Sequence, residues 1–267
     1  MNILIIGAKS FVGNSLIKSL KKKNNIILTS KNYKAKNVFN LNDPGSINLD
    51  LKKIDLILYL SYLKREKKID FQNQIFSIKK LIQLKRTKTK ILLFSTINPN
   101  LKNKFSYSYT KYFIEKEILK NDGIIIRMGF VYNDKKKIKK NVVYNIAKIF
   151  SFFSIMPITN PEYKIYTTNL DLFTNIVANM ITKKKFKKFI YIIIDKKRMK
   201  ISDLFKILLN KNNFSLTKFP RNLIDLFFKT FIRFFSKKNY NKYINLIESE
   251  NFKLSNKKYK TIYTNKL

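Results

Sequence analysis

Short apolar runs alternate with helical stretches through the first half of the chain, and this alternation restricts the fold more than any other feature. Apolar runs of about four to eight residues are typical of buried strands, whereas apolar residues three and four apart form one face of a helix. The predicted strands are residues 2–6, 26–28, 37–41, 54–61, 90–95, 124–128 and 189–194, and the run at 37–41 is the weakest. The predicted helices are residues 11–22, 70–86, 107–120, 142–157, 170–181, 201–210 and 222–235.

Strands separated by helices pair in parallel, because the intervening helix returns the chain to the same end of the sheet. The crossovers are right-handed, which places helices on both faces of the sheet. We therefore expect an α/β fold with a Rossmann-like, doubly wound parallel sheet. Gly123 follows the predicted helix at 107–120, where we expect a positive φ that glycine adopts without strain.

The composition excludes several kinds of chemistry. The chain contains no cysteine, no histidine and no tryptophan. Disulfides, thiolate nucleophiles, Cys/His zinc sites and Ser-His-Asp relays are therefore excluded. Any proton transfer must use tyrosine, lysine, a carboxylate or a cofactor.

The chain is strongly basic, with 56 Lys or Arg against 16 Asp or Glu and a formal net charge of +40. Only six of the basic residues are arginines, and lysine is spread along the whole sequence. A dedicated phosphate-binding face would cluster its charge and use more arginine, so we expect no specific nucleic-acid binding. A basic protein that attracts polyanions without specificity remains an alternative.

We expect a cytoplasmic protein. The apolar run at residues 2–6 is too short for the apolar region of a signal peptide. The sequence has no uncharged apolar run of about 18 residues, so we expect no membrane-spanning helix.

Residues 7–13 (GAKSFVG) lie between the first predicted strand and the first predicted helix. A tight glycine turn at this junction lets a dinucleotide's pyrophosphate meet the backbone N–H groups at the helix start. Ser10 stands where a middle glycine is usual, and its hydroxyl could donate to phosphate. The predicted cofactor contacts here are Gly7, Ser10, Phe11, Val12 and Gly13. The alternative is a strand–turn–helix junction with no ligand.

The end of the second predicted strand bears on the choice between NAD and NADP. An acidic residue there would bind the 2′-hydroxyl of NAD, but the sequence has Ser30 and Lys31 instead. Lys31 or Lys34 could pair with a 2′-phosphate, which gives a slight preference for NADP while NAD stays open. Asn40 and Leu41, after the weak strand, are predicted to contact adenine, and a simple turn is the alternative.

Tyr107 and Lys111 lie four residues apart and so share one face of the helix predicted at 107–120. A tyrosine with its usual pKa of about 10 is a poor acid or base at neutral pH. We expect the ammonium of Lys111 to stabilise the phenolate and lower that pKa. Tyr107 could then exchange a proton with a substrate hydroxyl or carbonyl while hydride moves on a nicotinamide, with Lys111 also bound to the cofactor ribose.

In this order of motifs the chain resembles the short-chain dehydrogenase/reductase superfamily, specifically its extended branch of NAD-dependent epimerases and dehydratases. The matching segments are GAKSFVG, IDLILYLS, a helix carrying Asn73, ILLFST, YSYTK, IIIRMGFVY, and TTNLDLF with Asp171 at a helix start. The resemblance covers residues 1–195 and fades afterwards.

The resemblance implies a nucleotide-linked sugar as substrate and a role in surface polysaccharide biosynthesis. It makes Thr96 the hydroxyl that binds the reacting oxygen, Tyr107 the general acid/base and Lys111 its partner. It also places Leu60 and Ser61 beside the cofactor. The acidic pair of dehydratases is replaced here by Ile97 and Asn98, so we expect epimerisation or keto-reduction rather than elimination of water. A catalytically degenerate nucleotide-binding scaffold or sensor of the same fold is the alternative.

The resemblance also suggests how the chain divides. Residues 1–165 would form the NAD(P)-binding Rossmann-like domain. Residues 166–267 would complete the sheet with the strand at 189–194 and form a small, mostly helical C-terminal substrate lobe. Side chains that could reach a nucleotide diphosphate, none of which we assign to a site, are Arg127, Tyr132, Tyr163, Arg198 and Arg221.

The segment 222–235 (NLIDLFFKTFIRFF) has a narrow polar stripe on an otherwise apolar helix pattern. We expect it to pack in the core or against another subunit, with a homodimer left open. The alternative is peripheral contact with an anionic membrane surface.

Overall fold

The computed structural model describes residues 1–63, 67–99, 101, 104–133, 155–158, 162–184, 186, 189–209, 215–218, 220, 222–223, 226 and 260–264. The chain divides into two compact units. The first comprises Met1–Gly129, Leu170–Ile194 and Ser255–Leu267, and the second comprises Phe130–Asn169 and Asp195–Leu254. Every residue that the sequence predicts for the cofactor and catalytic sites lies in the first unit.

A parallel β-sheet forms the centre of the first unit. Its seven described strands lie in the order β13-β10-β5-β4-β3-β1-β2, and each pairs in parallel with its neighbours. The strands are β1 (Asn2–Ile6), β2 (Asn25–Leu28), β3 (Leu56–Tyr59), β4 (Lys90–Thr96), β5 (Ile124–Met128), β10 (Ile190–Ile194) and β13 (Lys260–Tyr263). The predicted doubly wound α/β fold is confirmed.

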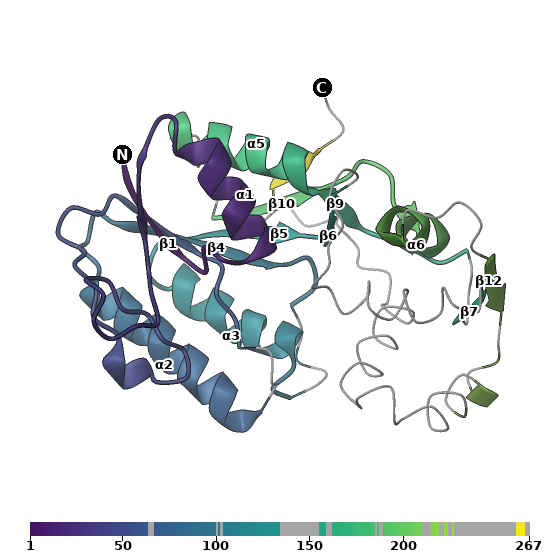
Figure 1. The fold of residues 1–267 in the computed structure, drawn as a ribbon, viewed down its shortest axis with the longest axis horizontal. Coiled ribbons are helices and arrows are strands. Elements are labelled where there is room, and N and C mark those ends of the chain that lie inside the picture. Colours follow the sequence, from purple (N-terminus) through teal and green to yellow (C-terminus); the bar gives the residue numbers. More distant parts are fainter. Residues whose placement is uncertain are drawn as a thin grey trace. The chain divides into compact units, whose positions relative to one another are not determined.

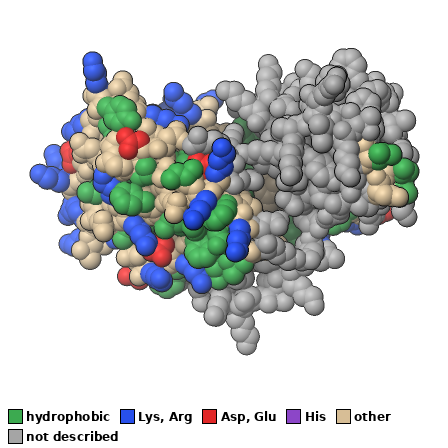
Figure 2. All heavy atoms as spheres, turned by 90° about the horizontal axis from the view of Figure 1, so that it is seen from below, with side chains coloured by type: hydrophobic (Ala, Val, Ile, Leu, Met, Phe, Trp, Pro, Cys, Tyr) green, Lys and Arg blue, Asp and Glu red, His purple; other side chains and the backbone are tan. Residues whose placement is uncertain are grey.

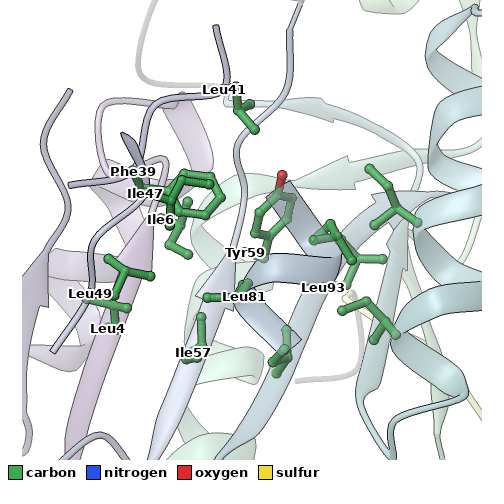
Figure 3. Close-up of a cluster of buried hydrophobic side chains, with 14 of the residues drawn as sticks. Leu4, Ile6, Phe39, Leu41, Ile47, Leu49, Ile57, Tyr59, Leu81 and Leu93 are labelled. Carbon is green, nitrogen blue, oxygen red and sulfur yellow. The ribbon is translucent and has the colours of Figure 1, made fainter. Parts of the chain in front are cut away.

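Helices cover both faces of this sheet (Figure 1). On one face lie α1 (Phe11–Leu20) and α5 (Leu170–Thr182), and on the other lie α2 (Lys68–Leu84) and α3 (Tyr107–Leu119). Successive side chains of a strand point to opposite faces, so Ile3 and Ile5 pack in one core cluster and Leu4 and Ile6 in the other. Figure 3 shows the second cluster, in which side chains of β1, β3 and β4 meet Leu81 of α2.

The order of the strands locates the place where a ligand would bind. β1 lies between β2 and β3, so the chain that leaves β1 and the chain that leaves β3 begin their crossovers on opposite faces of the sheet. In open α/β sheets, ligands bind outside the carboxyl ends of the strands at such a switch point. Residues 7–13 and 60–62 occupy this position.

One predicted strand is not a strand, and one strand of the sheet was not predicted. Residues 37–41 form no ladder in the sheet; Val38 makes only isolated bridges to Ser30 and Asn48. The segment is apolar because Phe39 and Leu41 fill the core beside the sheet. The edge strand β13 was not predicted, because its four residues KTIY carry too little apolar pattern to stand out.

The prediction for Gly123 was also wrong. The positive φ after α3 belongs to Asp122, at 54°. Glycine is required at 123 for space instead. A Cβ there would collide with the Ile118 side chain and lie 2.9 Å from the Ile118 carbonyl oxygen.

The described part of the second unit contains short strand pairs and one helix. β6 (Phe130–Tyr132) pairs with β9 (Thr167–Asn169), β8 (Lys164–Ile165) with β11 (Met199–Lys200), and β7 (Ile155–Ile158) with β12 (Ser215–Lys218). The helix α6 (Ile201–Leu209) matches its prediction, whereas the end of the helix predicted at 142–157 is strand β7. The rest of that segment, and all of 222–235 except residues 222, 223 and 226, lie outside the described residues. Within the described ranges, each helix is too short or too polar to cross a bilayer.

Candidate active site

The turn after β1 depends on glycine at position 7. Its φ is +93°, and a Cβ there would lie 2.9 Å from the carbonyl carbon of Leu60 and 2.9 Å from the amide nitrogen of Ser61. The Leu60 amide in turn donates to the Ile6 carbonyl at 2.8 Å. The turn and the segment that leaves β3 are therefore in backbone contact.

Ser10 caps the first helix. Its Oγ accepts from the Gly13 amide at 3.0 Å, and its own amide donates to the Gly7 carbonyl at 3.0 Å. Position 13 also has no room for a side chain, since a Cβ there would lie 2.6 Å from the Gly7 carbonyl oxygen. The first amides of a helix have no intrahelical acceptor, and in the described part of the chain those of Phe11 and Val12 have none of any kind. These two N–H groups are available to a phosphate.

The loop after β2 carries the residues predicted to contact the adenosine. The Ser30 Oγ accepts from the Asn32 amide at 3.0 Å, and Lys31 and Lys34 are exposed. Tyr33 is 63% exposed, with its hydroxyl 3.2 Å from Asp43 Oδ2. The described geometry therefore leaves two lysines at the solvent-facing end of this strand.

The side chains of Asn40 and Leu41 stabilise the loop that carries them. The Asn40 side-chain oxygen accepts from the Asn42 amide at 3.1 Å, and its amide nitrogen lies 3.5 Å from the Tyr33 hydroxyl. Leu41 is buried in the core cluster. In this conformation the Asn40 side chain is bonded within the loop and the Leu41 side chain is buried, and their contact with adenine stays a prediction.

The start of α3 places the predicted acid/base pair. Ser106 caps the helix, its Oγ accepting from the Tyr109 amide at 3.2 Å, so that Tyr107 is the first helical residue. Lys111 follows one turn later and is only 2% exposed. Its Nζ donates to the Phe94 carbonyl of β4 at 2.8 Å and lies 5.6 Å from the centre of the Tyr107 ring.

Lys111 is held in an apolar environment. Burial lowers the pKa of its ammonium to about 8, and the nearby Glu115 carboxylate opposes this shift. The free energy of the charged form falls near an opposite charge and rises with loss of hydration. Here the loss of hydration is the larger effect.

The expected lowering of the Tyr107 pKa is wrong for this conformation. Burial raises the Tyr107 pKa above its usual value, and the Glu115 carboxylate raises it further. The Lys111 ammonium does not offset these effects. Its hydrogen bond runs to Phe94, and it lies beside the Tyr107 ring. The phenol is therefore protonated at neutral pH.

Thr96 ends β4, two residues beyond the carbonyl that binds Lys111. It is half-buried and pairs in register with Met128 of β5. The next amide, of Ile97, donates to the Met128 carbonyl at 2.9 Å. The end of β4 thus connects the predicted hydroxyl residue with the predicted lysine.

Tyr62 connects the glycine turn with the phenol. Its ring meets the Tyr107 ring edge to face, with the centres 4.6 Å apart. Because Ser61 touches Gly7 through the backbone, residues 60–62 run from the turn to Tyr107. The structure therefore brings residues 7–13, 60–61, 96, 107 and 111 to the carboxyl edge of one sheet. No pattern in the sequence indicated Tyr62.

Sequence reasoning also missed Glu115. It lies one turn after Lys111 on α3, and its carboxylate binds the Arg127 guanidinium through two contacts, of 3.1 and 2.6 Å. The regular spacing of 107, 111 and 115 was a signal for it. Arg127 is therefore not a candidate contact for a nucleotide diphosphate, because it is only 8% exposed and paired with Glu115.

The remaining candidates of that set lie in the second unit. Arg198 stacks on the Tyr166 ring at 4.4 Å and donates to its hydroxyl at 2.7 Å. Tyr132 is buried and Tyr163 is half-buried, while Arg221 lies outside the described residues. Over the described ranges, no group of three or more carboxylates lies close enough to hold a metal ion.

Comparison with known proteins locates this fold among solved structures. No protein-family model and no curated protein matches the sequence. A dTDP-4-dehydrorhamnose reductase from Yersinia enterocolitica matches with a TM-score of 0.61 at 17% identity, over 81% of this chain and 83% of that chain. A UDP-N-acetylglucosamine 4-epimerase from Bacillus cereus matches with a TM-score of 0.59 at 14% identity, over 81% and 85%.

A third structure of this kind, RMD from Pseudomonas aeruginosa complexed with NADPH, matches with a TM-score of 0.58 at 12% identity, over 81% and 86%. At these identities the likeness defines a class of fold. It is a Rossmann-like α/β fold with a doubly wound parallel sheet, as the sequence predicted.

Proposed function

We propose that the protein is an NAD(P)-dependent enzyme that reduces or epimerises a nucleotide-linked sugar, in surface polysaccharide biosynthesis. The observation that carries the proposal is the arrangement at the carboxyl edge of the sheet. There a glycine turn with two available amides connects, through residues 60–62, to the Tyr107 phenol beside a buried lysine. Solved structures with this fold include epimerases, reductases and dehydratases that act on nucleotide sugars.

The residues at the turn fit a dinucleotide. The amides of Phe11 and Val12 would bind the pyrophosphate at the helix N-terminus, where the helix dipole favours negative charge. Gly7 and Gly13 keep the backbone accessible. The Ser10 Oγ acts as an acceptor toward the Gly13 amide, so its own hydrogen can still form a hydrogen bond to a phosphate. Leu60 and Ser61 would lie beside the cofactor. Similar structures contain NADPH or NAD, and the exposed Lys31 and Lys34 give our slight preference for NADP.

The chemistry needs a proton donor next to a hydride carrier. A bound nicotinamide supplies or accepts the hydride. Tyr107, protonated at neutral pH, would donate its proton to the substrate carbonyl oxygen as the hydride reaches the carbonyl carbon, so the carbonyl becomes a hydroxyl. Thr96 would hold that oxygen. Below about pH 8 the Lys111 ammonium would stabilise the phenolate that remains.

The protonated phenol favours reduction over epimerisation as the first step. Epimerisation begins by removing a proton from a substrate hydroxyl, which requires the phenolate form of Tyr107. The raised pKa of Tyr107 disfavours this form. Ile97 and Asn98 provide no carboxylate for elimination of water, so we propose no dehydratase activity.

Two observations keep a non-catalytic nucleotide-binding protein as the second candidate. The Ser10 hydroxyl occupies the Gly13 amide, and the Lys111 ammonium is bound to Phe94. Both bonds would have to loosen or adapt in a working site. This candidate predicts binding of cofactor without turnover.

A screen of ligands tests the proposal directly. A ligand that binds only the folded protein raises its melting temperature. We expect NADPH or NADH to stabilise the protein, and one of a panel of UDP-, dTDP- and GDP-linked keto-sugars to be reduced in its presence. If none of NAD, NADH, NADP and NADPH raised the melting temperature, both candidate functions would be refuted.

Tyr107→Phe separates the two candidates. The substitution removes only the hydroxyl that exchanges the proton, so turnover should fall by at least about a hundredfold, as for loss of a general acid. Cofactor affinity should stay within a few-fold. An unchanged rate in Tyr107→Phe would exclude the proposed acid/base role.

A further inference from the structure

A buried ion pair lies next to the proposed acid/base residues and has no part in the function above. Glu115 of α3 and Arg127 of β5 form a two-pronged contact, with Nε to Oε1 at 3.1 Å and Nη2 to Oε2 at 2.6 Å. The two side chains are only 4% and 9% exposed. Burying two charges costs several kcal/mol of desolvation each, so a pair of this kind is weak evidence for stability alone.

The position of the pair points to another role. Tyr107, Lys111 and Glu115 occupy successive turns on one face of α3, four residues apart. Arg127 pairs in register with Ser95, the residue after the Phe94 carbonyl that accepts from Lys111. The phenol, the ammonium, the carboxylate and the guanidinium thus follow one another between α3 and strands β4 and β5.

The carboxylate acts oppositely on its two neighbours along the helix. It favours the protonated form of Lys111 and disfavours the phenolate form of Tyr107. Arg127 binds the carboxylate with a group that is always charged, because a guanidinium does not lose its proton in proteins. Other ionisable side chains that are buried on this face of the sheet are Tyr59 of β3 and Asp70 of α2. Of all these groups, Glu115 is the one whose charge acts on Lys111.

We propose that Glu115, held by Arg127, is a positioning residue that keeps the Lys111 ammonium charged at neutral pH. This inference rests on the proposed function for its catalytic meaning, since a charged Lys111 is what the phenolate of Tyr107 needs. The charge on Lys111 can be measured whether or not the protein binds a cofactor.

The measurement is the contribution of Lys111 to folding stability as a function of pH. In the unfolded chain a lysine keeps its proton up to about pH 10.5, whereas in the folded protein Lys111 releases it near pH 8. Between these values the unfolded state binds more protons, so the folded state gains stability as pH rises. Comparing each protein with its Lys111→Met version, from pH 6 to 10, isolates this gain.

The onset of this rise in stability is compared between the wild type and variants of Glu115 and Glu117. In Glu115→Gln the rise in stability should begin at least about one pH unit lower than in the wild type, because the favourable charge is gone. Glu117→Gln is the matched control. Glu117 lies on the same helix and binds Lys120 at 3.6 Å at the surface, so the onset should stay near pH 8.

Glu115→Gln removes the carboxylate that binds the buried Arg127 guanidinium and could unfold the protein. The double variant Glu115→Leu with Arg127→Met removes both charges, and such replacements usually preserve stability. It should show the same lowered onset. An onset near pH 8 in the double variant would show that the pair is only structural and would overturn the proposal. Stabilisation of the wild type by NADPH or NADH, measured in parallel, tests the proposed function separately.

Discussion

At the scale of single residues, Ser10 shows how one side chain can change the turn that opens the first helix. A glycine there would leave the Gly13 amide without an acceptor, as the third available N–H group of the helix start. Ser10 instead supplies that acceptor from its own Oγ. The helix gains a cap, and a phosphate loses one direct donor.

Two substitutions at position 10 separate these effects. Ser10→Ala should lower the free energy of unfolding by about 1 kcal/mol, because the cap is lost. Ser10→Gly should cost only a few tenths of a kcal/mol and should bind NADPH or NADH at least as tightly as the wild type. Chemical denaturation measures the free energy of unfolding of each variant, and cofactor titration measures its affinity for NADPH or NADH. Weaker cofactor binding in Ser10→Gly would show that the serine hydroxyl contacts the phosphate.

The pKa of Tyr107 illustrates what a sequence cannot supply at this scale. The spacing of Tyr107 and Lys111 correctly places both on one helix face. Whether the ammonium or the burial controls the phenol depends on where Nζ points, and it points to the Phe94 carbonyl. The pairing of Arg127 could not be read from the sequence for the same reason, since its partner Glu115 belongs to a different element.

At the scale of elements, most of the correctly predicted strands are buried on both faces, and the partly exposed β2 is an exception. Residues 3–6 and 56–59 are almost fully buried, and their unbroken apolar runs follow from that. The run at 37–41 also contains apolar residues, but it belongs to a loop, from which Phe39 and Leu41 pack into the core. An apolar run reports burial, and the backbone pairing that distinguishes a strand is set by neighbours elsewhere in the chain.

The edge strand β13 is joined to the sheet by backbone pairing with β10. The Thr264 amide donates to the Ile194 carbonyl at 2.9 Å as the strand ends. Thr264→Pro removes this donor, so the free energy of unfolding should fall by about 1 kcal/mol or more below that of Thr264→Ala, which keeps it. Equal denaturation midpoints for the two variants would mean that this pairing contributes nothing to stability.

At the scale of the whole molecule, the charge of +40 dominates. The lysines in the ion pairs of Lys36, Lys120 and Lys200 are 40% to 79% exposed, and such surface pairs contribute little. On the face drawn in Figure 2, the Lys and Arg side chains of the described residues are interspersed with hydrophobic and neutral ones. On this face the described residues show no single strip of basic side chains.

Repulsion of this size makes stability depend on salt. Raising NaCl from about 0.02 to 0.2 M shortens the screening length about threefold. The melting temperature should then rise by several degrees, because screening relieves self-repulsion in the compact state. Calorimetry at constant pH checks this. A melting temperature that falls over this range would show that attractive ion pairs outweigh the repulsion.

The backbone contact between Gly7 and residues 60–61 has a consequence for how a change in the turn reaches Tyr107. The chain between this contact and the Tyr62 ring is one or two residues long, and that ring packs on the Tyr107 ring. One extra residue after Leu60 would lengthen this short segment by up to about 3.5 Å. Such an insertion would separate the Tyr62 ring from Tyr107, while the hydrogen bond from Lys111 to Phe94 still holds α3 against β4.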